Sequence, residues 1–222
     1  MTEADTFAAL LKARYSCRAY RPDPVPREVI ESALRDAQQV PSWNNVQPWQ
    51  VIALSAPETS AFAEAFYAHV ESGERQSDIP FPLRYEGIYQ QRRRTCGWQL
   101  YGALGIEKGD REASGKQMRE NFRLFGAPHC LLITAPKDLG TYGVLDCGAY
   151  VTAVMLALQA RGLASIAMAA VASFSPFVRD RYDIAPDRDL VCAIAFGHAD
   201  PDHPANSYRT NRADLSEVVD WR

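Results

Sequence analysis

Four short apolar runs, spread widely along the chain, most constrain how it can fold. They cover residues 49–54 (WQVIAL), 129–135 (HCLLITA), 163–168 and 190–196, and each has the length and composition of a buried β-strand. Helical patterns separate the runs, so strands and helices are mixed without the regular alternation of a doubly wound sheet. The sequence therefore predicts the α+β class.

Helical spacing of apolar residues and the size of the chain predict one domain. We expect helices up to about Arg14 and over residues 30–37, 57–71, 86–104, 111–124, 144–160 and 176–182. With 222 residues, 47% of them hydrophobic, the chain can enclose one sizeable core. We interpret residues 1–222 as a single domain, with 73–85 a mobile loop and 73–125 a lid or substrate-pocket insertion.

Charge and cysteine usage exclude several classes of protein. The formal net charge is -3, which leaves no broad basic field for nucleic acid or an anionic membrane. The five cysteines are odd in number and form no CxxC pair, a usage typical of free thiols in a reducing compartment. The N-terminal segment has no secretory core, and the apolar stretch 144–158 is shorter than the roughly 20 residues that cross a bilayer. We expect a soluble cytoplasmic protein.

Motifs of several common enzyme classes are missing from the sequence. It contains no GxGxxG, GxxxxGK[ST], GxSxG or HExxH. His198 and His203 flank two aspartates, but their spacing matches no helical ligand face and predicts a solvated turn. We therefore expect no metal site.

Two arginine clusters at opposite ends of the chain are the strongest functional signal. Arg14, Ser16 and Arg18 follow the first helix, where two-residue alternation places Ser16 and Arg18 on the same side. Arg209 and Arg212 lie in an RTNR segment near the C-terminus. Guanidinium groups match phosphate oxygens two at a time, so together the clusters suit a phosphate. Taken alone, each cluster is better explained as ordinary surface arginines.

Two further segments suit a flat, polar ligand. Residues 41–49 (PSWNNVQPW) join a helix to a strand through uncharged side chains that both donate and accept hydrogen bonds. Residues 162–170 (GLASIAMAA) are small, which lets the backbone approach a ring closely. The alternative interpretations are a polar loop between prolines and an ordinary buried strand.

In this order and spacing, the segments resemble the FMN-dependent nitroreductase family. The resemblance runs from about residue 7 to 219 and also includes SPFVRDRYDI and LVCAIAFGHADPDHPAN. Residues 85–125 resemble the branch with nitrobenzoate and nitroaromatic reductases. The resemblance implies an α+β fold with a mixed central sheet flanked by helices, in an intertwined homodimer with two FMN sites at the subunit interface.

The resemblance also implies which residues bind the flavin. Arg14, Ser16, Arg18 and Arg209 or Arg212 would hold the ribityl phosphate, with Tyr15 contributing through its backbone. The partner subunit would supply Pro41, Ser42, Trp43 and Asn45, and the backbone of Ala167, Met168 and Ala169 would face the isoalloxazine ring. Gln47 is a further candidate cofactor-binding residue. No side chain is expected to act as a catalytic acid or base, since the flavin carries the chemistry.

This sequence departs from the commonest family pattern in two places. Trp43 stands where a small residue is frequent, which makes the partner's wall of the site bulkier. Ala167 and Met168 stand where a Pro-Gln pair or similar is frequent, which removes a side-chain hydrogen bond to the flavin.

Aromatic residues are candidates for the acceptor pocket. They are Trp43, Tyr85, Tyr89, Phe122 and Phe125, although core packing explains such residues as well. The run Arg92–Arg94 either binds the 2′-phosphate of NADPH or forms a solvated helix face, and we favour the second.

The resemblance predicts an enzyme that transfers hydride from NAD(P)H through FMN to nitroaromatic or quinone-like acceptors in a ping-pong cycle. The alternatives are another FMN reaction on the same fold, such as reductive dehalogenation, enoate reduction or dehydrogenation, and a flavin-binding protein without turnover. The expected partners are a second copy of the chain and a small aromatic acceptor.

Overall fold

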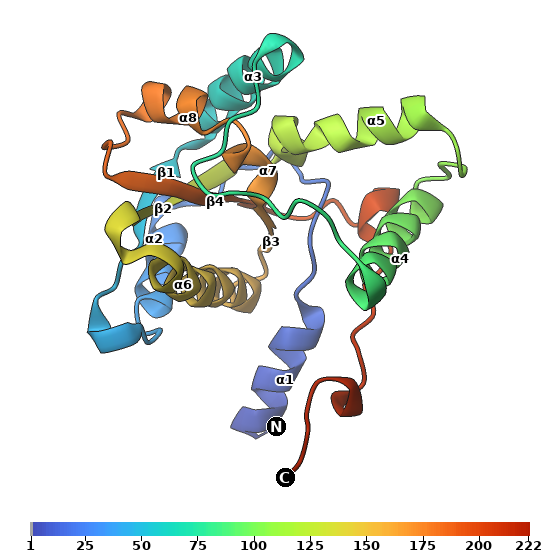
Figure 1. The fold of residues 1–222 in the computed structure, drawn as a ribbon, viewed down its shortest axis with the longest axis horizontal. Coiled ribbons are helices and arrows are strands. Elements are labelled where there is room, and N and C mark those ends of the chain that lie inside the picture. The colour runs from blue at the N-terminus through green and yellow to red at the C-terminus, as the bar shows by residue number, and fades with distance from the viewer. Residues whose placement is uncertain (1) are drawn as a thin grey trace.

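A computed structural model describes residues 2–222 as helices packed around a sheet (Figure 1). The helices are α1 (Glu3–Ala13), α2 (Arg27–Ala37), α3 (Ala56–Ser72), α4 (Gly87–Ala103), α5 (Arg111–Arg119), α6 (Gly140–Ala160), α7 (Ala169–Ala172) and α8 (Ser175–Tyr182). The strands are β1 (Gln50–Leu54), β2 (His129–Pro136), β3 (Ala164–Met168) and β4 (Arg188–Gly197). The α+β class and all four predicted strands are confirmed.

The strands of the sheet lie in the order β1-β2-β4-β3, and every neighbouring pair is antiparallel. Parallel pairing in the described residues is confined to two isolated bridges, Ser16 with Ser165 and Gln76 with Phe174. The sheet is therefore mixed only through these bridges. The first of them ties the segment after α1 to the free edge of β3.

Both faces of the sheet are covered, because successive residues of a strand point to opposite sides. In β2, Cys130 and Leu132 join a hydrophobic cluster with α3, α7 and α8, whereas Leu131 and Ile133 join a second cluster with α2 and α6. Residues of β4 divide between the two clusters in the same way. A strand covered on both faces needs apolar side chains on both, which is why CLLI at the centre of β2 is an unbroken apolar run.

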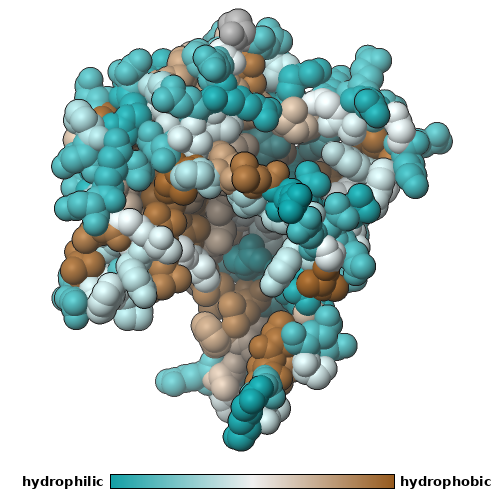
Figure 2. Space-filling view, viewed as in Figure 1, coloured by the Kyte–Doolittle hydropathy of each residue, from teal (hydrophilic) through white to brown (hydrophobic). Residues whose placement is uncertain are grey.

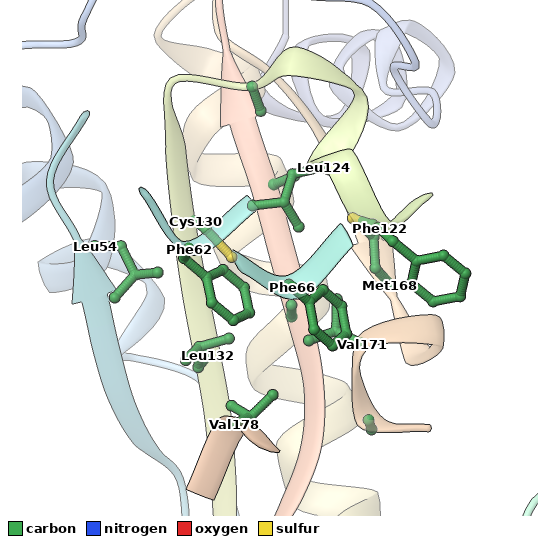
Figure 3. Packing of buried hydrophobic residues seen from close by; sticks show 14 of the residues in the cluster. Leu54, Phe62, Phe66, Phe122, Leu124, Cys130, Leu132, Met168, Val171 and Val178 are labelled. Carbon is green, nitrogen blue, oxygen red and sulfur yellow. The ribbon is translucent and has the colours of Figure 1, made fainter. Parts of the chain in front are cut away.

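An aromatic cluster fills the first face. Phe62 and Phe66 project from α3 onto the sheet, between Leu54 on one side and Phe122 and Met168 on the other (Figure 3). The ring of Phe66 stacks on Phe62 at 5.1 Å and meets Phe122 edge-on at 5.7 Å. Burying each such ring contributes roughly 1.5–3 kcal/mol.

Helix α6 covers the second face and is longer than predicted, since it begins at Gly140 rather than at residue 144. By length and composition alone it is apolar enough to cross a membrane. Its buried face nevertheless packs in the second cluster, where Tyr150 stacks on Trp49 at 4.8 Å. We therefore identify α6 as a core helix. Its other face exposes Tyr142 and Leu145.

The predicted mobile loop at 73–85 is anchored at its start. The backbone N–H of Gln76 donates a hydrogen bond to the carbonyl of Ser173. The carbonyl of Gln76 accepts a hydrogen bond from the backbone N–H of Ser175 at 2.9 Å. Asp78 accepts hydrogen bonds from Arg179 and from the backbone N–H of Leu190, at 3.2 and 2.8 Å. Only the part from residue 80 onward is exposed throughout, and it leads across the molecule to α4 (Figure 1).

Candidate functional site

The two arginine clusters meet at one cavity, which we call the arginine cavity. It has a volume of about 580 Å³ and is lined by residues from α1, the segment after it, α4 and the C-terminal segment. They include Arg14, Tyr15, Ser16, Arg18, Arg209 and Arg212, together with Lys12, Cys96 and Tyr208. The structure thus brings together the two arginine clusters, predicted to bind a phosphate, that lie nearly 200 residues apart in the sequence.

Local backbone structure positions the first cluster. Helix α1 ends at Ala13, and Arg14 has the extended conformation. The chain then pairs with β3, where Ser16 bridges Ser165 and the N–H of Cys17 donates to the Ser165 carbonyl at 3.2 Å. This pairing sets the alternation that turns Ser16 and Arg18 to the same side.

Contacts between the two clusters hold Arg18 and Arg209 in place. The backbone N–H of Arg18 donates to Oδ1 of buried Asn206 at 2.8 Å, and its Nη1 donates to the hydroxyl of Tyr208 at 2.9 Å. The Arg209 guanidinium lies over the ring of Tyr15 at 3.7 Å, a cation–π geometry. Tyr15 therefore contributes its ring as well as its backbone.

The arginine cavity is strongly cationic. None of the described residues that line it is acidic. Burial lowers the pKa of Arg14, and repulsion from Arg212 lowers it further. Burial also raises the pKa of Tyr15 to about 12, so its hydroxyl stays protonated. Cations held this close without an acid favour the binding of an anion, and a phosphate monoester matches the donor set of guanidinium and hydroxyl groups.

The loop at residues 41–47 lies away from the arginine cavity, on the far side of α6 (Figure 1). Asn44, Asn45 and Gln47 have positive φ angles of 50°, 56° and 47°, which non-glycine residues seldom adopt. Two contacts hold this conformation: Ser42 Oγ accepts from the N–H of Gln47 at 2.9 Å, and Asp146 of α6 accepts from the N–H of Trp43 at 3.2 Å. A single protomer therefore does not bring Pro41–Gln47 to the arginines.

The end of β3 is open where the sequence predicted close approach to a ring. Ala167 and Ala169 are exposed, whereas the side chain of Met168 points into the core. The hydroxyl of Ser165 is buried without a hydrogen-bond partner within residues 2–222. Ala167 and Ala169 are thus accessible at this edge of the sheet, and the Met168 side chain is not.

The candidate acceptor aromatics divide into two groups. Trp43, Tyr85 and Tyr89 are exposed. Phe122 and Phe125 are only 2% and 6% exposed, because the predicted helix at 111–124 ends at Arg119 and a 3-10 turn carries both rings into the aromatic cluster. Core packing accounts for Phe125, and Phe122 reaches a pocket only at its edge.

Other predicted features have structural explanations. Arg92 pairs with Glu217 at 3.2 Å, and Arg93 lies over the ring of Tyr85 at 5.6 Å. His203 accepts a backbone hydrogen bond from Ala205 within a turn. In the described chain, no group of three or more His, Cys, Asp or Glu residues is placed to hold a metal ion.

Sequence reasoning missed four residues of this region: Lys12, Asp146, Asn206 and Tyr208. Asn206 orders the C-terminal turn by donating to the carbonyls of Ala19 and Asp200. Asp146 could have been found, because a charged residue inside a predicted apolar helix indicates a specific hydrogen-bond partner. No local pattern distinguishes Asn206 or Tyr208, since their partners lie nearly 190 residues away.

Comparison with known proteins identifies the same family that the sequence segments resemble. The profile of the nitroreductase family matches residues 11–198. The chain belongs to the nitroreductase family. It is 36% identical to nitroreductase NfnB of Mycolicibacterium smegmatis over 95% of this chain and 90% of the relative. It is 33% identical to a 4-nitrobenzoate reductase of Nocardioides sp., over 97% and 89% of the two chains.

A solved structure confirms the nitroreductase fold. The crystal structure of the FMN-dependent NfnB from Mycobacterium smegmatis, in complex with NADPH, superposes with a TM-score of 0.95. The match covers 100% of both chains at 32% identity.

Proposed function

We propose that this nitroreductase-family chain is an enzyme that uses FMN to carry reducing equivalents from NAD(P)H to nitroaromatic or quinone-like acceptors. The arginine cavity is the observation that carries the proposal. It gathers five cationic side chains with no acid among the described residues that line it. Family membership and the FMN and NADPH of the similar crystal structure support the same assignment.

The residues of the cavity fit the phosphate of FMN. Arg14, Ser16, Arg18, Arg209 and Arg212 supply charged and hydroxyl donors, and the phosphate relieves the repulsion between Arg14 and Arg212. From this anchor the ring extends along the open end of β3, where Ala167 and Ala169 are accessible. Met168 takes part only through its backbone.

A second copy of the chain completes the site in this proposal. The loop Pro41–Gln47 cannot reach its own arginine cavity, so its Ser42, Trp43, Asn45 and Gln47 serve the cavity of the partner. The exposed apolar residues Phe7, Leu11, Tyr142 and Leu145 of α1 and α6 supply an interface. Figure 2 shows a hollow in this face, with hydrophobic side chains gathered beside α6 and at the lower end near α1.

When bound, FMN supplies reversible two-electron chemistry. For a nitro acceptor the balanced outcome is a nitroso compound and water, which takes two electrons and two protons. The hydride of NAD(P)H supplies both electrons and one proton, and a proton from solvent is the second. In this proposal the residues of the chain bind the phosphate and leave the end of β3 open to substrates. NAD(P)H and the acceptor would then occupy the space beside the flavin ring in turn, in a ping-pong cycle.

Purified protein kept under nitrogen tests the proposal. We expect the absorbance of an oxidised flavin, its bleaching by NADPH or NADH, and its return when nitrobenzoate or a quinone is added. Bleaching without return to any nitro compound or quinone would favour another FMN reaction on this fold. Bound flavin that neither nicotinamide reduces would indicate a binding protein without turnover, and a colourless protein that ignores added FMN would refute the proposal.

A further inference from the structure

A second cavity, which we call the Arg75 pocket, lies beside the open end of β3. Its volume is about 420 Å³, within the range of small-molecule sites. Arg75, Gln76 and Phe81 line it from the segment that follows α3, Asn121 and Phe122 from the turn after α5, and Ala170 from α7. None of the described residues around it is acidic.

Arg75 carries a charge that the chain does not neutralise. In the described part of the chain its guanidinium makes no hydrogen bond or ion pair. The guanidinium carbon lies over the ring of Phe174, 5.9 Å from the ring centroid. Arginines nearby differ: Arg179 pairs with Asp78 at 3.2 Å and Arg181 with Glu58 at 3.0 Å. The charge of Arg75 is therefore available to a ligand.

Most other polar groups of the pocket are already satisfied. Ser77 and Ser173 donate their hydroxyls to the carbonyls of Ile79 and Ala170, each at 2.6 Å, and Asn121 donates to Met118 at 2.8 Å. The backbone of Gln76 bonds on both sides, which fixes the chain beside Arg75. The amide side chain of Gln76 has no recorded partner among residues 2–222 and is a second free donor.

The walls of the Arg75 pocket suit an aromatic ring. Phe81 is half exposed at the rim, and the edge of Phe122 forms part of the floor. A planar ligand with one anionic end thus finds aromatic surface and a guanidinium in one cavity. A carboxylate is the anion that a free guanidinium and a neighbouring amide bind most directly.

We propose that the Arg75 pocket binds the acceptor and that Arg75, with Gln76, holds a carboxylate on its ring. The inference rests on the proposed function, because Ala170 directly follows the segment assigned to the flavin ring. A carboxylate held at Arg75 places the opposite end of the acceptor toward β3, where electrons must arrive. Aromatic carboxylates are then the preferred acceptor class, ahead of neutral nitroaromatics of the same size.

A pair of matched acceptors tests the assignment. Steady-state kcat/KM is measured for 4-nitrobenzoate and for neutral 4-nitrobenzamide with the FMN-loaded enzyme, Arg75→Gln and Arg84→Gln. We expect Arg75→Gln to lower the preference for the carboxylate by about 10- to 100-fold, the effect of one charged hydrogen-bonded contact. Arg84 lies on the same segment and pairs with Glu86, so its substitution should leave the preference unchanged. An unchanged preference in Arg75→Gln would overturn the proposal.

Calorimetric titration with benzoate separates this proposal from the proposed function, because benzoate has no nitro group to reduce. We expect the FMN-loaded protein to bind benzoate, and Arg75→Gln to bind it about 10- to 100-fold more weakly. If benzoate binding depends on Arg75 but no nitro compound is reduced, the pocket assignment stands and the proposed function fails. If nitro compounds are reduced but benzoate binds equally to both proteins, the pocket assignment fails alone.

Discussion

Two regions of the molecule use apolar residues and arginines in opposite ways. The sheet region consists of the four strands with α2, α3, α6, α7 and α8, and the flank consists of α1, α4 and residues 207–222. Around the sheet, the apolar clusters are buried and Arg179 and Arg188 have partners: Arg179 meets Asp78, and Arg188 donates to Thr134 and to the Pro48 carbonyl. On the flank, neither α1 nor α4 buries a residue in the described chain, and the arginines of the arginine cavity face no acid among the described residues that line it.

This difference shows which part of the chain is complete by itself. The sheet region pairs Arg179 and Arg188 within the chain and buries two apolar clusters, so its packing needs no ligand, and Arg75 at its edge is the exception. The flank leaves cations together and apolar helix faces exposed. In our proposal an FMN phosphate and a second protomer supply what the flank lacks. Variants in the two regions should therefore fail in different ways.

The largest effect should come from the aromatic cluster. Phe66→Ala opens a cavity among fully buried rings, and we expect the free energy of unfolding to fall by about 3–5 kcal/mol in urea titrations. Leu83→Ala, at an exposed position, should change it by no more than about 0.5 kcal/mol. A cost below about 1 kcal/mol for Phe66→Ala would break the contrast, because the sheet region would then not depend on this packing.

On the flank, affinity for FMN rather than stability should change. Arg18→Ala removes a charged donor from the arginine cavity, and FMN should bind about 10- to 100-fold more weakly in fluorescence titrations. Arg27→Ala removes an exposed cation from α2 that pairs only with Glu31 among the described residues, and serves as the control. Equal FMN affinities for the two variants would contradict the placement of Arg18.

Asp146 joins the core helix α6 to the exposed loop at residues 41–47. Asp146→Ala leaves the N–H of Trp43 without its acceptor, so the free energy of unfolding should fall by about 1–3 kcal/mol. Asp146→Asn keeps one acceptor oxygen and should cost less. Thr152→Ala, on the exposed face of the same helix, is the control. If Asp146→Asn were the more harmful change, the hydrogen bond would not be the reason for the aspartate.

The smallest effect concerns pH. Burial lowers the pKa of His129 below 6.5, and its Nε2 accepts the N–H of Val25 at 2.8 Å, so the folded protein holds the neutral ring. The unfolded chain takes up a proton first as pH falls, so this contribution to stability is present above about pH 6.5 and is lost below it. Urea unfolding between pH 8 and 5 should show the slope, reduced in His129→Gln. An identical slope in the variant would assign the loss to other groups.

Sequence patterns predicted the strands, the α+β class and the two arginine clusters, because each depends on periodicity or on residue chemistry. They did not predict that Phe122 and Phe125 turn into the core. That outcome depends on positive φ angles of 53° and 54° at Leu124 and Phe125, which no helical pattern indicates. They also missed the anchoring of residues 76–78, which rests on contacts with distant strands and helices.

The sequence predicted the arginines of the candidate site but not the residues that hold them in position. Guanidinium chemistry singled out the arginines as candidate phosphate ligands, and their convergence on one cavity follows only from the fold. Asn206 and Tyr208, which hold Arg18, bond across the whole length of the chain and leave no local signal. No sequence pattern marks Arg75 within its polar segment, because its lack of a partner in the described chain follows only from the fold.

Comparing FMN with riboflavin tests the central claim most directly, because riboflavin has the same ring and ribityl chain without the phosphate. We predict that the wild-type protein binds FMN at least about 100-fold more tightly, and that the double variant Arg14→Ala/Arg212→Ala removes most of this difference while its riboflavin affinity stays the same. Equal affinities of the wild-type protein for the two flavins would show that the arginine cavity does not hold a phosphate.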